Sequence, residues 1–143
     1  MKIFYNNLLE FTDTLLSKVG LDDHSVKSVS FGLCNASLRG VDSHGIRLLK
    51  HYVNSALSGR KNPKPSYKFY KKFPCVGVLD ADNAFGHAAG MKSIDLGEKI
   101  AIDNGIGLVA VINSSHSGSM AGMALKGADK GFITFAFTHA DSL

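Results

Sequence analysis

The stretch "GLVAVINSSHSGSMAGMALKGADKGFITFAFT", Gly107 to Thr138, decides the fold class, because a strand-like pattern occurs at both of its ends. "GLVAVIN" is a continuous apolar run, which is typical of a strand buried on both faces. "MAGMALKGADKG" has the composition of a helix of small residues, and "FITFAFT" has the pattern of another buried strand. The stretch predicts a strand–helix–strand unit and an α/β (α+β) fold class.

The first sixty residues have a different, purely helical pattern. Apolar side chains at helical spacing predict a helix from Leu8 to Val19. Asp22 is the expected N-cap of a second helix that ends near Gly40. A third helix, with Asp42 or Ser43 as its N-cap and Ile46, Leu49, Val53 and Leu57 on its buried face, is expected to end at Gly59. These three helices predict an N-terminal helical region over residues 1–62.

A connector, "NPKPSY", leads into the second predicted region, residues 63–143. "YKFYKK" and "CVGVLDA" are two candidate strands, which would form a hairpin around Phe73–Pro74. A long helix is expected from Gly86 to Asp103. The alternating pattern halts after one strand–helix–strand unit, so we expect the sheet of the second region to lack strands, and the chain to be an N-terminal piece of a longer protein.

Composition excludes several classes of protein. The chain has 143 residues, a formal charge of +4 and 45% hydrophobic residues, which is typical of one soluble globular domain. The basic residues gather at Gly59–Lys72 without a nucleic-acid-binding motif, so we expect a solvated loop and no nucleic-acid partner. Cys34 and Cys75 lie in apolar contexts and are expected to be buried free thiols. No apolar run reaches the ~18 residues of a membrane span, so a cytoplasmic protein is predicted.

The first candidate site is the beginning of the third predicted helix, where Ser43, His44 and Arg47 follow Gly40. A helix N-terminus disfavours positive charge, so a neutral His44 is expected there. A neutral imidazole can accept a proton from a substrate hydroxyl, and an arginine can hold a carboxylate with two hydrogen bonds. From these residues alone, an ordinary helix cap with a surface histidine explains the pattern equally simply.

The second candidate site is "NSSHSGS", Asn113–Ser119, which lies between a predicted strand and a predicted helix. Ligands bind at the carboxyl ends of strands in open α/β sheets, which favours His116 as a functional residue. The backbone N–H groups of Ser117 and Gly118 would form an anion seat at the helix start. The alternative is an ordinary turn whose polar groups are hydrogen-bonded and whose histidine caps a neighbouring backbone group. No G-x-S-x-G, CxxC or HxxxH pattern is present, so a serine nucleophile and a metal site are not expected.

Together, four stretches resemble the N-terminal part of the malate/L-lactate dehydrogenase family of the non-Rossmann type, which includes ureidoglycolate dehydrogenase and 2,3-diketo-L-gulonate reductase. They are "GVDSHGIRLLKHYV", "LDADNAFGHAAG", "NGIGLVAVINSSHSG" and "GADKGFITFAFTHAD", in the order and spacing of the family. "GIGLVA" matches the glycine spacing of the Rossmann dinucleotide fingerprint, G-x-G-x-x-A, but it follows a predicted helix and begins a strand. The true fingerprint follows a strand and begins a helix, so a Rossmann cofactor site is not expected.

The resemblance implies that residues 63–143 are a truncated part of a non-Rossmann cofactor- and substrate-binding domain with a mixed sheet and flanking helices. It also implies an NAD- or NADP-dependent oxidoreductase that acts on 2-hydroxy or 2-oxo acids and forms a homodimer. It implies catalytic roles for His44 and His116 and a place in the substrate pocket for Ser43. The arginine of the family often stands at the position of Leu48, whereas this chain has Arg47. Ala140 matches a cofactor-contact position, and Ser117 and Gly118 are expected to bind cofactor. The competing hypothesis is a truncated, non-catalytic fragment that at most binds a nucleotide or partner weakly.

Overall fold

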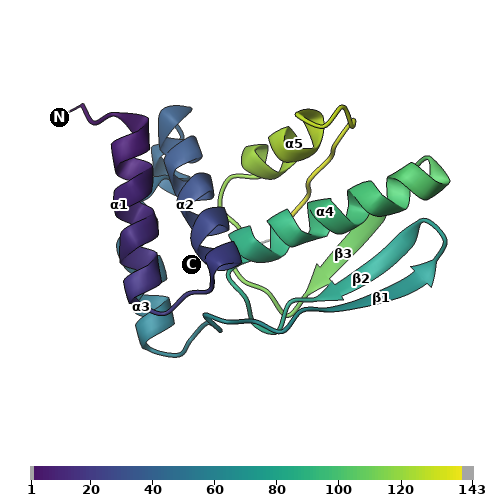
Figure 1. Ribbon diagram of the computed structural model, residues 1–143, viewed down its shortest axis with the longest axis horizontal. Coiled ribbons are helices and arrows are strands. Elements are labelled where there is room, and N and C mark those ends of the chain that lie inside the picture. The colour runs from purple at the N-terminus through teal and green to yellow at the C-terminus, as the bar shows by residue number, and fades with distance from the viewer. Residues whose placement is uncertain (1, 140–143) are drawn as a thin grey trace.

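The computed structural model describes residues 2–139, and it confirms a mixed α/β fold (Figure 1). The helices are α1 (Tyr5–Lys18), α2 (Asp23–Leu38), α3 (Leu49–Leu57), α4 (Gly86–Asn104) and α5 (Ala121–Ala128), with 3₁₀ turns η1 (Asp42–His44) and η2 (Ile46–Leu48). The strands are β1 (Lys68–Phe73), β2 (Val76–Asp80) and β3 (Leu108–Ile112). The helices α1, α2 and α3 lie together at one end of the molecule, and the sheet lies at the other (Figure 1).

Helix α2 begins as the sequence predicts. The Ser25 backbone N–H donates a hydrogen bond of 2.7 Å to the Asp22 carboxylate, which occupies the N-cap position. We expect Asp22→Ala to lower the free energy of unfolding by about 1 kcal/mol, because that backbone donor loses its partner. Urea unfolding of the variant and of Asp23→Ala, which leaves the cap intact, measures the difference. Equal stability of Asp22→Ala and wild type would contradict a stabilising cap.

The predicted start of the third helix is wrong. The chain passes through η1 and η2, and the α-helix begins only at Leu49. The reason is a tertiary contact: Gly45 is extended and packs against Ser37 of α2, whose hydroxyl accepts a hydrogen bond of 2.9 Å from the Ile46 backbone N–H. His44 therefore does not lie in the first turn of an α-helix, and the argument that a helix N-terminus keeps it neutral does not apply.

The sheet has the order β1-β2-β3 and is mixed. The predicted hairpin is confirmed, since β1 pairs antiparallel with β2 around Phe73–Pro74. Strand β2 pairs in parallel with β3, from Val76 opposite Leu108 to Asp80 opposite Ile112. Because the two strands are parallel, their carboxyl ends and the loops that follow them lie side by side. Those loops are joined by a hydrogen bond of 2.8 Å from the Asn83 N–H to the Asn113 carbonyl oxygen.

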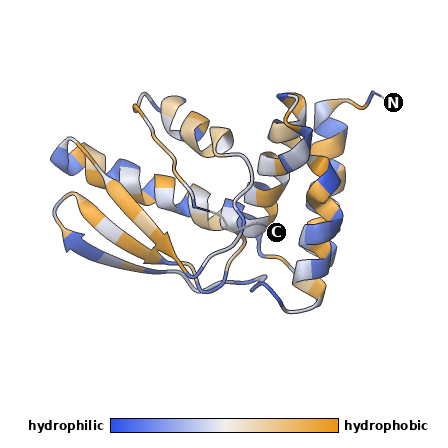
Figure 2. Ribbon diagram, turned by 180° about the vertical axis from the view of Figure 1, so that it is seen from behind, coloured by the Kyte–Doolittle hydropathy of each residue, from blue (hydrophilic) through white to orange (hydrophobic). Residues whose placement is uncertain are grey.

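Two expectations about the predicted strand–helix–strand unit are wrong. Strand β3 is half-buried on one face only: α4 covers that face, while Leu108 and Ile112 are exposed (Figures 1 and 2). Residues 132–138 form no strand, because no described strand pairs with them, and Ile133, Phe135 and Phe137 are largely exposed. The segment runs back beside α5 instead, where Thr134 contacts Gly127.

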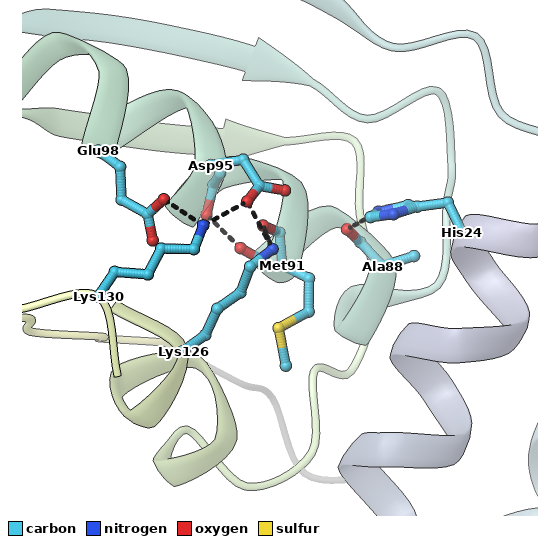
Figure 3. Close-up of polar contacts among 9 residues, drawn as sticks. His24, Ala88, Met91, Asp95, Glu98, Lys126 and Lys130 are labelled. Carbon is cyan, nitrogen blue, oxygen red and sulfur yellow. Dashed lines mark hydrogen bonds and ion pairs between the residues drawn. The ribbon is translucent and has the colours of Figure 1, made fainter. Parts of the chain in front are cut away.

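Helix α4 begins at Gly86, as predicted, and packs against both the sheet and α2. Polar contacts attach it on two sides (Figure 3). On one side, Lys126 of α5 and Lys130, which follows α5, form ion pairs of 2.7 Å and 2.6 Å with Asp95 and Glu98. On the other side, the His24 ring of α2 forms a hydrogen bond of 2.9 Å with the Ala88 carbonyl oxygen. These contacts attach the start of α4 to α2 and its middle to α5 and the turn after it.

The main core crosses the predicted boundary at residue 62. Phe85 and Ala88 pack with Leu16, Val29, Leu33 and other apolar residues of the three N-terminal helices. The division into 1–62 and 63–143 stays a prediction. Cys34 is a buried free thiol as expected, whereas Cys75 is only half-buried. None of the helices that the structure describes is long and apolar enough to cross a membrane.

Candidate active site

The two histidines singled out from the sequence meet in space. The His44 and His116 rings are stacked, with centroids 5.3 Å apart and an angle of 26° between their planes. His44 comes from η1 and His116 from the loop after β3, so the tertiary fold brings together two segments far apart in the chain. Ser43 forms a hydrogen bond of 2.9 Å with Nδ1 of His44. Ser43 therefore contacts the histidine and does not cap a helix.

The loop that carries His116 sits directly on the start of α4. The Ser115 hydroxyl accepts a hydrogen bond of 3.1 Å from the Gly86 N–H and donates one of 3.2 Å to the Ala84 carbonyl oxygen. A Cβ atom on Gly86 would overlap the backbone carbonyl groups of Ser115 and His116. Glycine at this position allows the loop and the helix to approach this closely, and the contact fixes the backbone of His116.

Tyr52 holds the His116 ring. Its hydroxyl forms a hydrogen bond of 2.9 Å with Nδ1 of His116 and lies 3.5 Å from the His116 carbonyl oxygen. Tyr52 is buried in the main core, and burial raises the pKa of its hydroxyl, which therefore stays protonated at neutral pH. Burial, and then the charges of His44 and His51, lowers the pKa of His116 below its ordinary value. His116 is consequently a neutral imidazole with one ring nitrogen fixed and the other available.

His87 lies beneath this pair and is 1% exposed. Its ring is wedged between Gly32 of α2 and Gly118, where an added Cβ atom on either glycine would overlap it. Within residues 2–139, neither ring nitrogen of His87 has a hydrogen-bond partner. Burial, and then the charges of His116 and His44, lowers the pKa of His87 to about 3. His87 is therefore neutral at neutral pH, and its ring fills the space between α2 and the loop that carries His116.

A pocket of about 180 Å³ opens beside His116. Its eight lining residues are His51, Tyr52, Ser55, Arg60, Lys61, Phe85, Ser115 and His116. None of the eight is acidic, and two are permanently cationic at neutral pH. The pocket is therefore suited to a small anionic molecule whose reacting atom lies next to an imidazole.

The remaining predicted site residues differ in their positions. Arg47 is exposed on η2 and does not line the pocket, and Leu48 packs against the main core. Ser117 and Gly118 are half-buried in the loop after His116, and Gly118 has a φ of 69° that favours glycine. Ala140 lies outside the described residues.

Sequence reasoning missed Tyr52, Arg60 and Lys61. Tyr52 lies on the buried face of α3. A buried tyrosine hydroxyl needs a polar partner, and this requirement could have indicated that Tyr52 contacts a site residue. Arg60 and Lys61 were part of a basic run that looked like a solvated loop. Among the residues that the structure describes, no group of three or more His, Cys, Asp or Glu side chains is placed to hold a metal ion.

Comparison with known proteins now identifies the family. Residues 3–143 match the family model described as malate/L-lactate dehydrogenase. The chain belongs to this family. Malate dehydrogenase of Pyrococcus abyssi is 37% identical over 143 residues, which are 100% of this chain and 40% of the relative. Ureidoglycolate dehydrogenase (NAD(+)) of Escherichia coli K12 is 29% identical over 143 residues, 100% of this chain and 41% of the relative.

Solved structures of the malate/L-lactate dehydrogenase family share the fold. The structure of malate dehydrogenase from Pyrococcus horikoshii superposes with a TM-score of 0.88 at 35% identity, over 92% of this chain and 38% of that one. The predicted resemblance is thus confirmed, and its named members are oxidoreductases. The chain spans about 40% of the length of the curated relatives it matches.

Proposed function

We propose that the protein containing this chain transfers a hydride between NAD or NADP and a 2-hydroxy or 2-oxo acid. The observation that carries the proposal is the stacked His44–His116 pair beside a pocket with cationic walls. The names of the malate and ureidoglycolate dehydrogenases support this class of substrate, and the second of them names NAD(+). A homodimer in the cytoplasm, as expected from the sequence, is part of the same proposal.

His116 is the proposed acid–base group. In the tautomer with its proton on Nδ1, the ring donates to the Tyr52 oxygen at 2.9 Å, and the tyrosine proton faces the His116 carbonyl oxygen at 3.5 Å. Nε2 then has a free lone pair that accepts the proton of a substrate hydroxyl. The imidazolium that results keeps the same bond to Tyr52. In the reverse direction, Nε2 returns the proton to the oxygen of a 2-oxo acid.

His44 is the proposed partner of His116 in this proton transfer. The two ring centroids lie 5.3 Å apart, so His44 stands directly beside the proposed acid–base group. The hydrogen bond from Ser43 fixes the orientation of the His44 ring at its Nδ1. In this proposal Ser43 and His44 line one side of the substrate site, and the residues of the pocket beside His116 line the other.

The residues after His116 fit the nicotinamide end of a cofactor. Ser117 and Gly118 follow His116 directly, and the Cα of Gly118 packs on the His87 ring. The backbone N–H groups of these two residues are therefore the contacts that we propose for the cofactor. The bound cofactor supplies the hydride acceptor or donor. These two loop residues, with Ala140, are the proposed cofactor contacts of this chain.

Steady-state assays on the protein at its full natural length test this function. A panel of 2-hydroxy acids is offered with NAD and with NADP, and the absorbance of the reduced cofactor is followed. Oxidation of at least one member supports the proposal. The competing hypothesis of a non-catalytic fragment predicts no hydride transfer with any acid in the panel.

Tyr52→Phe is expected to lower kcat about tenfold and to move the acid limb of the kcat/KM profile to lower pH. The variant removes the oxygen that accepts the Nδ1 proton of His116, so the imidazolium loses a stabilising hydrogen bond and its pKa falls. The measurement is the pH dependence of kcat/KM between pH 5 and 9. Phe85→Leu, a nearby change without a polar group, is the control for packing. An unchanged pH profile in Tyr52→Phe would exclude the tyrosine as the group that positions His116.

A further inference from the structure

We propose that Arg60 and Lys61 form the clamp that binds the carboxylate of the substrate, in the role that the sequence assigned to Arg47. This inference rests on the proposed function, because it names the carboxylate-binding residues of the same site. Arg60 and Lys61 line the pocket that also contains His116, whereas Arg47 is exposed and does not line it. The clamp would hold the acid group while the neighbouring hydroxyl faces His116.

The segment that carries the two cations is fixed by hydrogen bonds. Asn83, in the turn after β2, donates from Nδ2 to the Arg60 carbonyl oxygen at 3.0 Å. The Asn83 carbonyl oxygen accepts from the Asn62 N–H at 3.0 Å. The Lys61 N–H donates to the Ser55 carbonyl oxygen of α3 at 3.1 Å. The backbone between Gly59 and Asn62 is therefore attached both to α3 and to the turn after β2. This attachment holds the side chains of Arg60 and Lys61 at the pocket.

The Lys61 side chain is also oriented. Its Nζ donates a hydrogen bond of 2.9 Å to the Asn83 side-chain oxygen, which uses one of its three protons and leaves two for a ligand. Asn83 adopts a φ of 58°, a left-handed conformation that asparagine tolerates, and this conformation places both its backbone and its side chain against the segment. One asparagine thus holds the backbone and the ammonium group of the clamp.

The electrostatics of the pocket favour an anion. Burial, and then the charge of Arg60, lowers the pKa of Lys61, so the two cations lie close enough to destabilise each other. A bound carboxylate would relieve this repulsion, and none of the pocket's lining side chains is an acid that does so. The volume of about 180 Å³ is below the about 300–1,000 Å³ of pockets for drug-sized ligands, so a small acid is the fitting occupant.

Binding of L-lactate to the isotope-labelled chain, followed by NMR at the His116 ring and the Lys61 amide, tests the clamp. Loss of one charge-assisted hydrogen bond weakens binding roughly 10- to 100-fold. We therefore expect Lys61→Gln to weaken lactate binding at least about tenfold, and Arg60→Gln combined with Lys61→Gln about a hundredfold or more. Propane-1,2-diol, which keeps the hydroxyl and lacks the carboxylate, should bind wild type and variants equally weakly.

Arg47→Gln and Lys64→Gln are the matched controls, since each removes one exposed cation that does not line the pocket. Both should leave lactate affinity within about twofold of wild type, because a surface charge outside the pocket does not contact the ligand and contributes little. The inference is overturned if Arg47→Gln weakens binding and Lys61→Gln does not, or if lactate fails to bind the wild-type chain. It is also overturned if adenosine 2′-phosphate, a nucleotide phosphate, binds at Lys61 and lactate does not.

Activity separates this inference from the function on which it rests. In the protein at full natural length, Lys61→Gln should raise KM at least about tenfold and change kcat by less than threefold, because the clamp binds the ground state and the transition state alike. If lactate binding depends on Lys61 but no hydroxy acid is oxidised, the proposed function is contradicted and the clamp is supported. Oxidation with a KM that is insensitive to Arg60 and Lys61 would remove the clamp and leave the function.

Discussion

His116→Ala and His44→Ala are each expected to lower kcat at least about 100-fold in the protein at its full natural length, because general acid–base catalysis by a positioned side chain contributes roughly 10²–10⁴-fold. In the proposed mechanism both residues take part in moving the hydroxyl proton, because their rings are stacked. The measurement is steady-state oxidation of the preferred hydroxy acid. Added imidazole should restore part of the activity of His116→Ala, because a free base can enter the space that the ring leaves.

His51→Ala is the matched control for these two variants. His51 lines the same pocket but is exposed, and among the described residues no hydrogen bond joins it to His116, whose pKa its charge lowers. We expect a change in kcat of less than tenfold in this variant. Far-ultraviolet circular dichroism should show that all three variants are folded. Near-normal turnover of His116→Ala or of His44→Ala would remove that residue from the mechanism.

The second large effect is a loss of stability in acid that depends on His87. The pKa of this residue is about 3 in the folded chain and about 6.5 when the ring is exposed to water. Between these two values the unfolded chain binds a proton that the folded chain does not, so stability is complete above pH 6.5 and falls as the pH decreases. By pH 4 the contribution of this one residue to the loss should reach about 3 kcal/mol.

His87→Leu isolates this effect. Leucine resembles the ring in volume and brings no polar group, so the variant should be at least as stable as wild type at pH 7. Between pH 7 and pH 4 its free energy of unfolding should fall by about 3 kcal/mol less than that of wild type, as measured by urea unfolding. His139→Leu, at an exposed histidine, should keep the wild-type slope. A wild-type slope in His87→Leu would show that the ring is not the source of the acid sensitivity.

Local sequence patterns predicted the elements whose boundaries depend on local chemistry. Asp22 caps α2 as expected, and Gly105, with a φ of 79°, ends α4 within one residue of the predicted position. The β1–β2 hairpin also needs only short-range contacts. These features follow from caps, turns and periodicity, which are visible within a few residues of chain.

The failures involve contacts between distant segments. The third helix begins late because Gly45 packs against Ser37 of another helix, which no pattern around residue 45 reveals. Residues 132–138 have a strand-like composition, but a strand exists only with a paired neighbour. The hydrogen bond between Tyr52 and His116 joins positions 64 residues apart. For the same reason the sequence indicated the two histidines but not the tyrosine that holds one of them.

The wedging of His87 between two glycines has a consequence for how this protein can evolve. Gly32 lies in a helix of the N-terminal region and Gly118 lies in the loop after His116, so one ring links the two parts of the chain. A side chain at either glycine is compatible only with a smaller residue at position 87. A homologue that keeps the histidine is therefore expected to keep both glycines. One with a smaller residue there is free to vary at the position of Gly32, whereas the φ of 69° still favours glycine at the position of Gly118.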